Sequence, residues 1–383
     1  MLAQAANKVE QTIGHGSNAA TAQDVSQPQG KYAAQDGSTM KALTWQGKNS
    51  VRVIDVPKPA IAEPRDVLVR VTGSTVCGSD LHLLHGVILQ LAKGDVLGHE
   101  FCGVIEALGA EAERAGKVKV GDRVVASFQI ACGDCFFCRQ KLSSQCEKTN
   151  ANTTAQGMYG GRTAGMLGYS HFTGGFAGGQ AEYVRVPFGD VNLLKLPDDV
   201  PDEKGLYLSD ILCTAYNCVV DTGVSKDDIV AIWGAGAIGQ MATTFSFLVG
   251  AKRVILIDPV QWRLDHVQKH NPKVETLNPD ELKKAGSSVY KKLREMTDGR
   301  GPDDALECAA GEYAMGLMHK AEIALGLETD TSEIVNEMIE SVRNYGRCGI
   351  TGVYVGFVSA TFSILRIQLS SNIYRLITSI SAH

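Results

Sequence analysis

The chain has 383 residues, enough for two domains of ordinary size rather than one. Apolar residues make up 44% and charged residues 21%, as in globular proteins, and 37 Lys and Arg against 42 Asp and Glu give a net charge of −5, which argues against a nucleic-acid binder. No uninterrupted apolar run reaches the ~18 residues of a membrane span, so an integral membrane protein is excluded.

The amino-terminal segment, residues 1–38, differs in composition from the rest of the chain. It is rich in Ala, Gln, Ser, Asn and Gly and has almost no large apolar side chains, which predicts a disordered extension. It lacks the apolar core of a secretory signal, and no Arg precedes Arg52, which argues against a mitochondrial transit peptide. We therefore expect a cytoplasmic protein.

Two domains with different patterns follow. Residues 39–210 contain short strands broken by Gly and Pro, such as DVLVRVTG and AEYVRVP, and this pattern predicts an irregular, Gly-rich β-barrel. Residues 211–357 alternate strands with helices, which predicts a doubly wound parallel sheet. The expected fold class is therefore α/β with an additional β-barrel domain.

A glycine motif follows the apolar strand IVAIW of the second domain. Gly234, Gly236 and Gly239 form GxGxxG, a helix comes next, and the following strand ends in Asp258. These glycines would let the backbone approach a pyrophosphate at the helix N-terminus, with Asp258 on the adenosine ribose. The carboxylate, with no cation in the two residues after it, favours NAD over NADP. The alternative is a glycine turn without a ligand.

Four cysteines within residues 132–146 form a second motif: Cys132, Cys135, Cys138 and Cys146. Four thiolates at these spacings can close around one tetrahedral Zn²⁺, whose role would then be structural because no coordination position stays open. An iron–sulfur cluster is the competing metal site, but no Pro follows the fourth cysteine and no second cysteine set exists. Ordinary core cysteines are the remaining alternative.

A third signal is more dispersed. Cys77 lies in CGSDLH and His99 in GHEFCG, about twenty residues later. One Cys and one His can supply two ligands of a catalytic zinc and leave a position for substrate. Taken alone, a pair this far apart is more often part of a core than of a metal site.

Together these motifs resemble the zinc-dependent alcohol dehydrogenases of the medium-chain dehydrogenase/reductase superfamily, over residues 40–357 and in the family's order. The segments TGGFAGGQAEYVRVPFGDVNLLKLP and LYLSDILCTAYNCVV are most similar to the glutathione-independent formaldehyde dehydrogenase branch. The resemblance implies a GroES-like fold for the barrel and a Rossmann fold for the sheet. Quinone reductases of the same superfamily fit less well, because they usually lack the cysteine lobe and the ligand set.

The resemblance also implies the ligands of the catalytic zinc. Cys77 and His99 match the first two, and Asp210 matches the third, where many relatives carry Cys. The neighbouring Cys213 is an alternative because a thiolate is the softer ligand, but alignment on the Thr214-Ala-Tyr216 segment favours the carboxylate. Asp is an acceptable zinc ligand in any case.

The remaining site residues follow from the same resemblance. Glu100 matches the acid beside the metal, and Asp80 matches the carboxylate that orients the zinc-binding His. Ser79 corresponds to the hydroxyl that takes the alcohol proton, and His82 lies further along that relay.

The implied activity is hydride transfer between NAD and a small alcohol or aldehyde hydrate, with one catalytic and one structural zinc per chain. Thr214 is expected near the nicotinamide and Arg263 near the adenosine ribose. Family members are homo-oligomers, and no nucleic-acid or membrane partner is expected.

After Phe357 the likeness stops, and residues 358–383 form a divergent tail. A doubly wound sheet of six strands needs one more strand–helix unit, so we expect an incomplete sheet without the edge strand that the family uses for its dimer contact. A frameshift, a retained intron or a mistaken gene model is the expected explanation. The alternative function is therefore a catalytically inactive, truncated zinc-binding family member.

Overall fold

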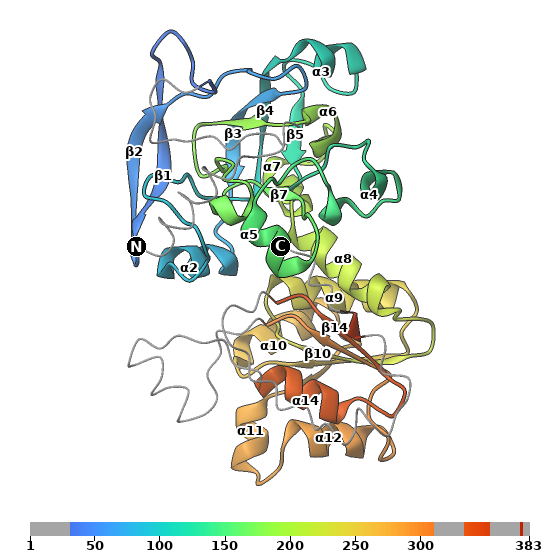
Figure 1. Cartoon of the computed structure of the whole chain (residues 1–383). Coiled ribbons are helices and arrows are strands. Elements are labelled where there is room, and N and C mark those ends of the chain that lie inside the picture. Colours follow the sequence, from blue (N-terminus) through green and yellow to red (C-terminus); the bar gives the residue numbers. More distant parts are fainter. Residues whose placement is uncertain (1–30, 310–332, 353–375, 378–383) are drawn as a thin grey trace. The chain divides into compact units, whose positions relative to one another are not determined.

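The computed structural model describes residues 31–309, 333–352 and 376–377, and the chain divides after Asp210 into two compact units (Figure 1). Residues 1–30 of the predicted extension, and the predicted tail apart from Leu376–Ile377, lie outside the described residues. Among the described residues, no helix is long and apolar enough to cross a membrane.

The packed chain begins earlier than the predicted boundary at residue 39. Tyr32 and Ala33 are each 6% exposed, and Ala33 forms an isolated β-bridge with Pro59. The Arg185 guanidinium lies 4.1 Å from the centre of the Tyr32 ring. One aromatic anchor therefore holds a segment whose composition is otherwise typical of disorder.

The first unit is built on antiparallel strands. A five-stranded sheet has the order β8-β3-β4-β5-β9, and β1 and β2 form a separate hairpin. Isolated bridges from Ala42 to Ala181 and from Thr44 to Val96 join β1 to loops of the same unit. The strands are β1 (Thr39–Gly47), β2 (Ser50–Pro57), β3 (Val67–Ser74), β4 (Phe101–Leu108), β5 (Arg123–Ala126), β6 (Gln129–Ile130), β7 (Gly165–Met166), β8 (Tyr183–Val186) and β9 (Leu193–Lys195).

Short helices connect these strands, and the core lies against the five-stranded sheet. Val67 and Val69 of β3 pack there with Phe101 and Ile105 of β4, because alternate side chains of a strand point to the same face. The helices are α2 (Gly78–His85), α3 (Ala110–Ala115), α4 (Phe136–Arg139), η1 (Ser143–Gln145), α5 (Thr153–Tyr159), η2 (His171–Thr173), α6 (Gly189–Asn192), α7 (Asp202–Gly205) and η3 (Leu206–Leu208).

The second unit is a parallel sheet of order β12-β11-β10-β13-β14-β15. This is the strand order of the predicted doubly wound fold. Among the described residues, its sixth position is held by Leu376 and Ile377 of β15, which pair with Cys348 and Gly349 of β14. The elements are α8 (Ile211–Thr222), β10 (Ile229–Trp233), α9 (Ala237–Leu248), β11 (Arg253–Ile257), α10 (Gln261–His270), β12 (Glu275–Leu277), α11 (Pro279–Lys284), α12 (Val289–Met296), β13 (Asp304–Glu307), α14 (Glu333–Ser341), β14 (Arg347–Ile350) and β15 (Leu376–Ile377).

Helices cover both faces of this sheet, so its strands are apolar on both sides (Figure 1). Val230 and Ile232 of β10 pack in one core with α8, α9 and α10. Ala231 and Trp233 of the same strand pack in the other core with α12 and α14. The continuous apolar run IVAIW is therefore explained by burial on two faces.

Candidate metal centres and nucleotide-binding loop

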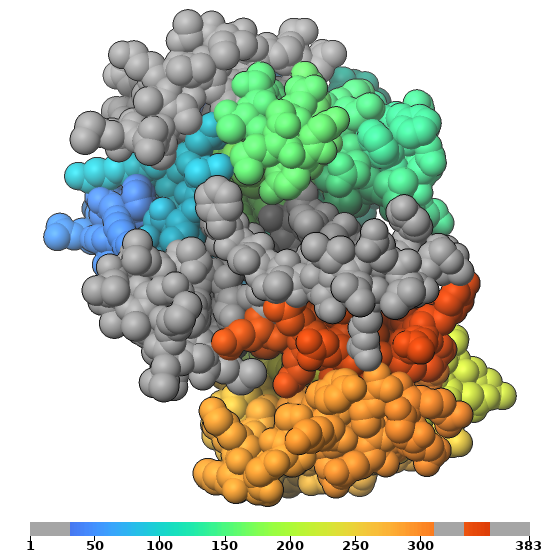
Figure 2. All heavy atoms as spheres, turned by 60° about the horizontal axis from the view of Figure 1, so that its bottom comes forward, coloured from blue at the N-terminus to red at the C-terminus, as the bar shows by residue number. Residues whose placement is uncertain are grey.

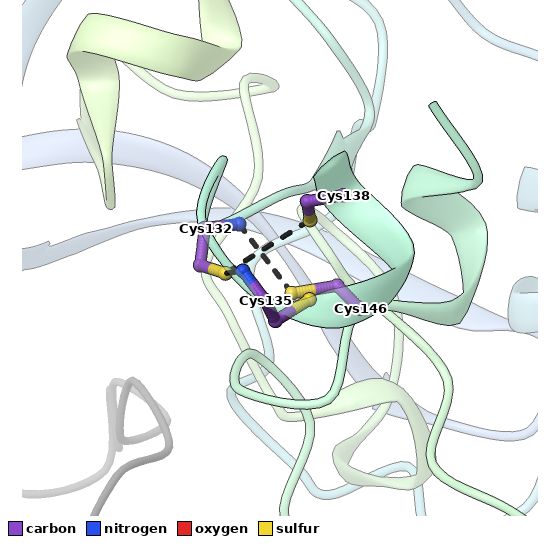
Figure 3. Close-up of side chains that lie close together, drawn as sticks. All are labelled: Cys132, Cys135, Cys138 and Cys146. Atoms are coloured by element: carbon purple, nitrogen blue, oxygen red, sulfur yellow. Dashed lines mark hydrogen bonds between the residues drawn. The ribbon is translucent and has the colours of Figure 1, made fainter. Parts of the chain in front are cut away.

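The four cysteines of the predicted structural zinc site lie together in one loop of the first unit (Figure 3). Their sulfur atoms all lie within 4.8 Å of one another, and those of Cys132 and Cys138 are 3.9 Å apart. All ten cysteines of the chain lie in the described residues, and none forms a disulfide. A tetrahedral zinc with Zn–S bonds of about 2.3 Å has S–S edges of about 3.8 Å. The cluster thus has the dimensions of a four-thiolate zinc site.

Backbone groups of the same loop support these sulfurs. The Cys132 N–H donates to Cys146 Sγ at 3.4 Å, and the Cys135 N–H donates to Cys132 Sγ at 3.3 Å (Figure 3). Arg65 ties the loop to the unit, because it donates to the Cys132 carbonyl at 3.0 Å and forms a two-pronged ion pair with Asp190. The loop therefore holds the thiols near one another through its own backbone and one external cation.

The second cluster joins residues that are far apart in the sequence: Cys77, His99, Glu100 and Asp210. Cys77 is the N-cap residue of α2, and His99 and Glu100 immediately precede β4. Asp210 follows η3, and its neighbour Ser209 donates a hydrogen bond to the Ala126 carbonyl at the end of β5. The antiparallel sheet therefore brings the ligand candidates together.

The His99 ring is oriented by carboxylates on its two sides. Its Nε2 atom lies 3.6 Å from a carboxylate oxygen of Glu100 and 3.6 Å from one of Asp210, and its Nδ1 atom lies 3.9 Å from Asp80 Oδ1. Both ring nitrogens are buried, and neither has a hydrogen-bond partner within the part of the chain that the structure describes. Edges of about 3.3–3.8 Å are what a tetrahedral zinc requires of its ligand atoms. The donor set, its spacing and the inward-facing Nε2 all fit a metal ion.

The charges of the groups in this cluster also favour a bound cation. Burial raises the pKa of Glu100 and the pKa of Asp80. Burial alone lowers the pKa of His99. The nearby Tyr169, Asp210 and Cys77 outweigh burial, and the pKa of this imidazole ends well above its ordinary value. Positive charge on the ring is favoured because acidic groups surround it. A bound divalent cation would be stabilised by the same acidic groups.

Three supporting residues were missed from the sequence. The Tyr169 ring lies 4.9 Å from the His99 ring, centre to centre. The Thr75 hydroxyl donates to Glu100 Oε2 at 2.5 Å, and Gln180 Nε2 donates to Asp80 Oδ2 at 3.2 Å. Gln180 belongs to the GGQAEY segment that carried the family resemblance, and that segment was the one available signal for its role.

The other residues predicted for the catalytic zinc site, Ser79, Asp80 and His82, lie on α2, the helix that Cys77 caps. Ser79 Oγ lies 3.8 Å from Cys77 Sγ, and the Ser79 side chain is partly exposed. His82 is buried on the same helix, and Asp80 Oδ2 accepts a hydrogen bond from the Cys77 N–H at 2.9 Å. Cys213, the alternative ligand, is exposed and is not part of the cluster.

The three glycines of the GxGxxG motif in the second unit are explained by different features of the structure. Gly234 has a φ of +100°, and a Cβ on Gly239 would lie 1.8 Å from the Gly234 carbonyl oxygen, so both must be glycine for internal packing. Gly236 is the N-cap residue of α9. Apart from its neighbours in the chain, no atom of the described residues lies within 4 Å of the position of a Gly236 Cβ. Packing does not explain Gly236, whereas the approach of a ligand to the helix N-terminus does.

Asp258 directly follows β11 beside this loop and is 4% exposed. Its two oxygens accept hydrogen bonds from the backbone N–H groups of Ala235 and Val260 at 2.7 and 2.8 Å. Arg263, in the first turn of α10, lies 3.8 Å from the Asp258 carboxylate. The two residues directly after Asp258 carry no cation, but this arginine supplies one from further along the chain. Thr214 is buried on α8, and its predicted position beside a nicotinamide stays a prediction.

A cavity of about 460 Å³ adjoins Asp258 and the glycine loop. Its walls include Trp233, Gly234, Ile257 and Pro259. This volume lies in the range of about 300–1,000 Å³ that is usual for small-molecule sites. Gly234 and Asp258 both line it, so the cavity adjoins the glycine loop and the residue that follows β11, at the edge of the sheet where dinucleotides bind in this fold.

Comparisons with known proteins agree with this geometry. Residues 63–198 match the alcohol dehydrogenase GroES-like domain family. A zinc-type alcohol dehydrogenase-like protein of Schizosaccharomyces pombe is 39% identical over 84% of this chain and 74% of its own length. The glutathione-independent formaldehyde dehydrogenase of Pseudomonas aeruginosa is 31% identical over 82% of this chain and 75% of its own length.

Solved structures give the same result. The alcohol dehydrogenase TADH from Thermus sp. ATN1 is similar with a TM-score of 0.66 and 33% identity, over 83% of this chain and 78% of that one. Fold and metal clusters define a two-domain zinc-type dehydrogenase. The chain belongs to the zinc-type alcohol dehydrogenases of the medium-chain dehydrogenase/reductase superfamily.

Proposed function

We propose that this protein oxidises small alcohols or aldehyde hydrates with NAD, using one catalytic and one structural zinc ion. The observation that carries the proposal is the buried His99 Nε2, which faces carboxylate oxygens of Glu100 and Asp210 at 3.6 Å and has no hydrogen-bond partner among the described residues. Cys77, His99 and Asp210 would hold the catalytic ion, with Glu100 as an additional carboxylate within reach. The four-cysteine cluster would hold the structural ion.

When bound, zinc lowers the pKa of a coordinated hydroxyl group and NAD accepts a hydride. The protein's residues prepare the site for that chemistry. Asp80 faces His99 Nδ1 and thereby favours the tautomer whose Nε2 is free for the metal. The Thr75 hydroxyl fixes one oxygen of Glu100 and so sets the direction of the other.

Ser79 is proposed to take the proton that the substrate hydroxyl loses. Its hydroxyl lies 3.8 Å from Cys77 Sγ, beside the ligand set, and the side chain is accessible. His82 lies three residues further along α2, so the two side chains share one face of the helix. This arrangement supports a relay from Ser79 to His82.

NAD is proposed as the cofactor in preference to NADP. A carboxylate offers about four acceptor positions, so Asp258 can accept from ribose hydroxyls in addition to its two backbone donors. The buried negative charge would repel a 2′-phosphate. Arg263 beside it softens that repulsion, so the preference should be clear but finite.

The substrate class is proposed from the metal cluster together with the name of the Pseudomonas relative, a glutathione-independent formaldehyde dehydrogenase. The test is NADH formation by the full chain from formaldehyde, acetaldehyde, methanol and ethanol without glutathione. We expect turnover of at least one of them, with NAD preferred to NADP. Asp258→Ser should narrow the cofactor preference in fluorescence titrations. A protein that holds both zinc ions but turns over none of these compounds would instead support the inactive zinc-binding alternative.

A further inference from the structure

The cavity beside Asp258 contains an acid that the proposed chemistry does not use, Glu337 of α14. Its walls are otherwise largely apolar and include Trp233, Ile257, Val289 and Ile334. The segments α11 and α12 (orange) and α14 (red) that contribute to it adjoin one another on the surface of this unit (Figure 2). A flat apolar ring would bury its faces well there.

Glu337 is held in one orientation. Its Oε1 atom accepts a hydrogen bond from the Trp233 indole N–H at 2.8 Å, and Trp233 itself is 3% exposed. This bond uses one of about four acceptor positions of the carboxylate, so capacity remains for a donor inside the cavity. Burial raises the pKa of Glu337, which shows that water screens the group poorly. A donor that meets it there forms a strong hydrogen bond.

The other charged groups of the cavity are less suited to recognition. Asp280 and Lys283 of α11 are exposed to solvent, where charge interactions are weak. Asp258 has two backbone donors and stands next to the glycine loop, where the ribose would lie. Of the carboxylates in the described lining, Glu337 is therefore the one left for the base beyond the ribose, and a charged acceptor binds a donor more strongly than the neutral hydroxyls of Ser287 and Ser288 do.

We propose that Glu337 selects the adenine base of the dinucleotide by accepting a hydrogen bond from its exocyclic amino group, while Trp233 and Ile257 bury the ring. This inference rests on the proposed use of NAD. A base without the amino group leaves the partly buried Glu337 carboxylate without this donor, and a site with an unpaired polar group rejects such an analogue. The discrimination should reach about tenfold or more, as expected for one hydrogen bond to a charged group.

The test measures binding without turnover. ADP-ribose and its counterpart with purine in place of adenine, which lacks the amino group alone, are titrated into the full chain by calorimetry. The unmodified protein should bind ADP-ribose about tenfold or more tightly. Glu337→Gln should reduce that ratio several-fold, because a neutral amide is a weaker acceptor. Glu295→Gln, at an exposed side chain of α12 that pairs with Lys292 and does not line the cavity, should leave the ratio unchanged.

The outcomes distinguish a failure of the Glu337 inference from a failure of the proposed dinucleotide cofactor. If the unmodified protein binds both compounds equally well, Glu337 does not select the base, and this inference falls while the proposed cofactor stands. The same holds if Glu337→Gln binds ADP-ribose and keeps the full ratio. If the unmodified protein binds neither compound, the dinucleotide proposal itself is overturned, and this inference falls with it. Equal binding by the unmodified protein overturns the inference even if the Glu337 variant does not fold.

Discussion

The two metal clusters of the first unit are built in opposite ways. Cys132, Cys135, Cys138 and Cys146 come from one short loop, offer thiols alone and receive hydrogen bonds from that loop's own backbone. The other cluster, Cys77, His99, Glu100 and Asp210, is collected from a helix cap, a strand entrance and the end of η3, and it mixes sulfur, nitrogen and oxygen. A local, closed set suits a structural ion, whereas a mixed set assembled by the fold suits an ion that works on substrate.

The largest effect is expected at the local cluster. Cys135→Ser should lower the zinc content from about two ions per chain to about one and destabilise the fold by several kcal/mol, because structural zinc contributes folding free energy directly. Metal analysis and denaturant unfolding measure the two effects. Cys213→Ser, at an exposed cysteine outside both clusters, is the matched control and should change neither. Unchanged zinc content in Cys135→Ser would refute the structural assignment.

At the mixed cluster we expect loss of chemistry with the fold retained. Asp210→Ala removes a proposed ligand, so zinc binding there should weaken by at least the ~10–100-fold typical of changes around a metal. Turnover should be abolished, while NAD binding and the cysteine-bound ion remain. Cys213→Ala should change turnover and zinc binding only slightly. An active Asp210→Ala variant beside an inactive Cys213→Ala variant would reverse the ligand assignment.

A smaller effect should come from Asp80, which faces the His99 Nδ1 atom without being in the ligand cluster. Asp80→Asn preserves the shape and can still accept from the Cys77 N–H, but it removes the charge that stabilises the oriented imidazole. Zinc affinity of the mixed site should fall by about 10–100-fold, measured by competition with a chelator. The cysteine-bound zinc serves as the internal reference, and a loss of both ions would show general damage instead.

The smallest effect concerns the tether of the cysteine loop. Arg65→Met removes the donor to the Cys132 carbonyl and leaves Asp190 without its partner. Unfolding free energy should fall by about 1–3 kcal/mol with zinc content unchanged. Denaturant unfolding of the zinc-loaded protein checks this. A loss of the cysteine-bound zinc would mean that the loop depends on the rest of the unit more than its internal bonds suggest.

The same contrast explains what could be predicted from the sequence. The cysteine cluster and the glycine loop were predictable, because spacing alone places Cys132 near Cys138 and Gly234 near Gly239. The mixed cluster could be named only through the family resemblance. Nothing in the local sequence brings Asp210 to His99; the sheet does, with Ser209 bonded to β5.

Residues that act through packing were the hardest to find. Tyr169 lies against the His99 ring, and Glu337 reaches Trp233 from a helix more than a hundred residues away. Tyr32 extends the packed chain into a segment whose composition predicts disorder. Such contacts depend on where elements meet, which periodicity and spacing do not contain.

Stepwise chelation is the most direct test that the two clusters hold ions with separate tasks. Zinc release, NADH formation and circular dichroism are followed together while a chelator is added to the full, zinc-loaded protein. Loss of about one ion per chain should abolish turnover with the fold intact, and unfolding should accompany loss of the second ion, because the closed thiolate site releases its metal last. Turnover that survives loss of the first ion, or a fold that collapses with it, would contradict the account.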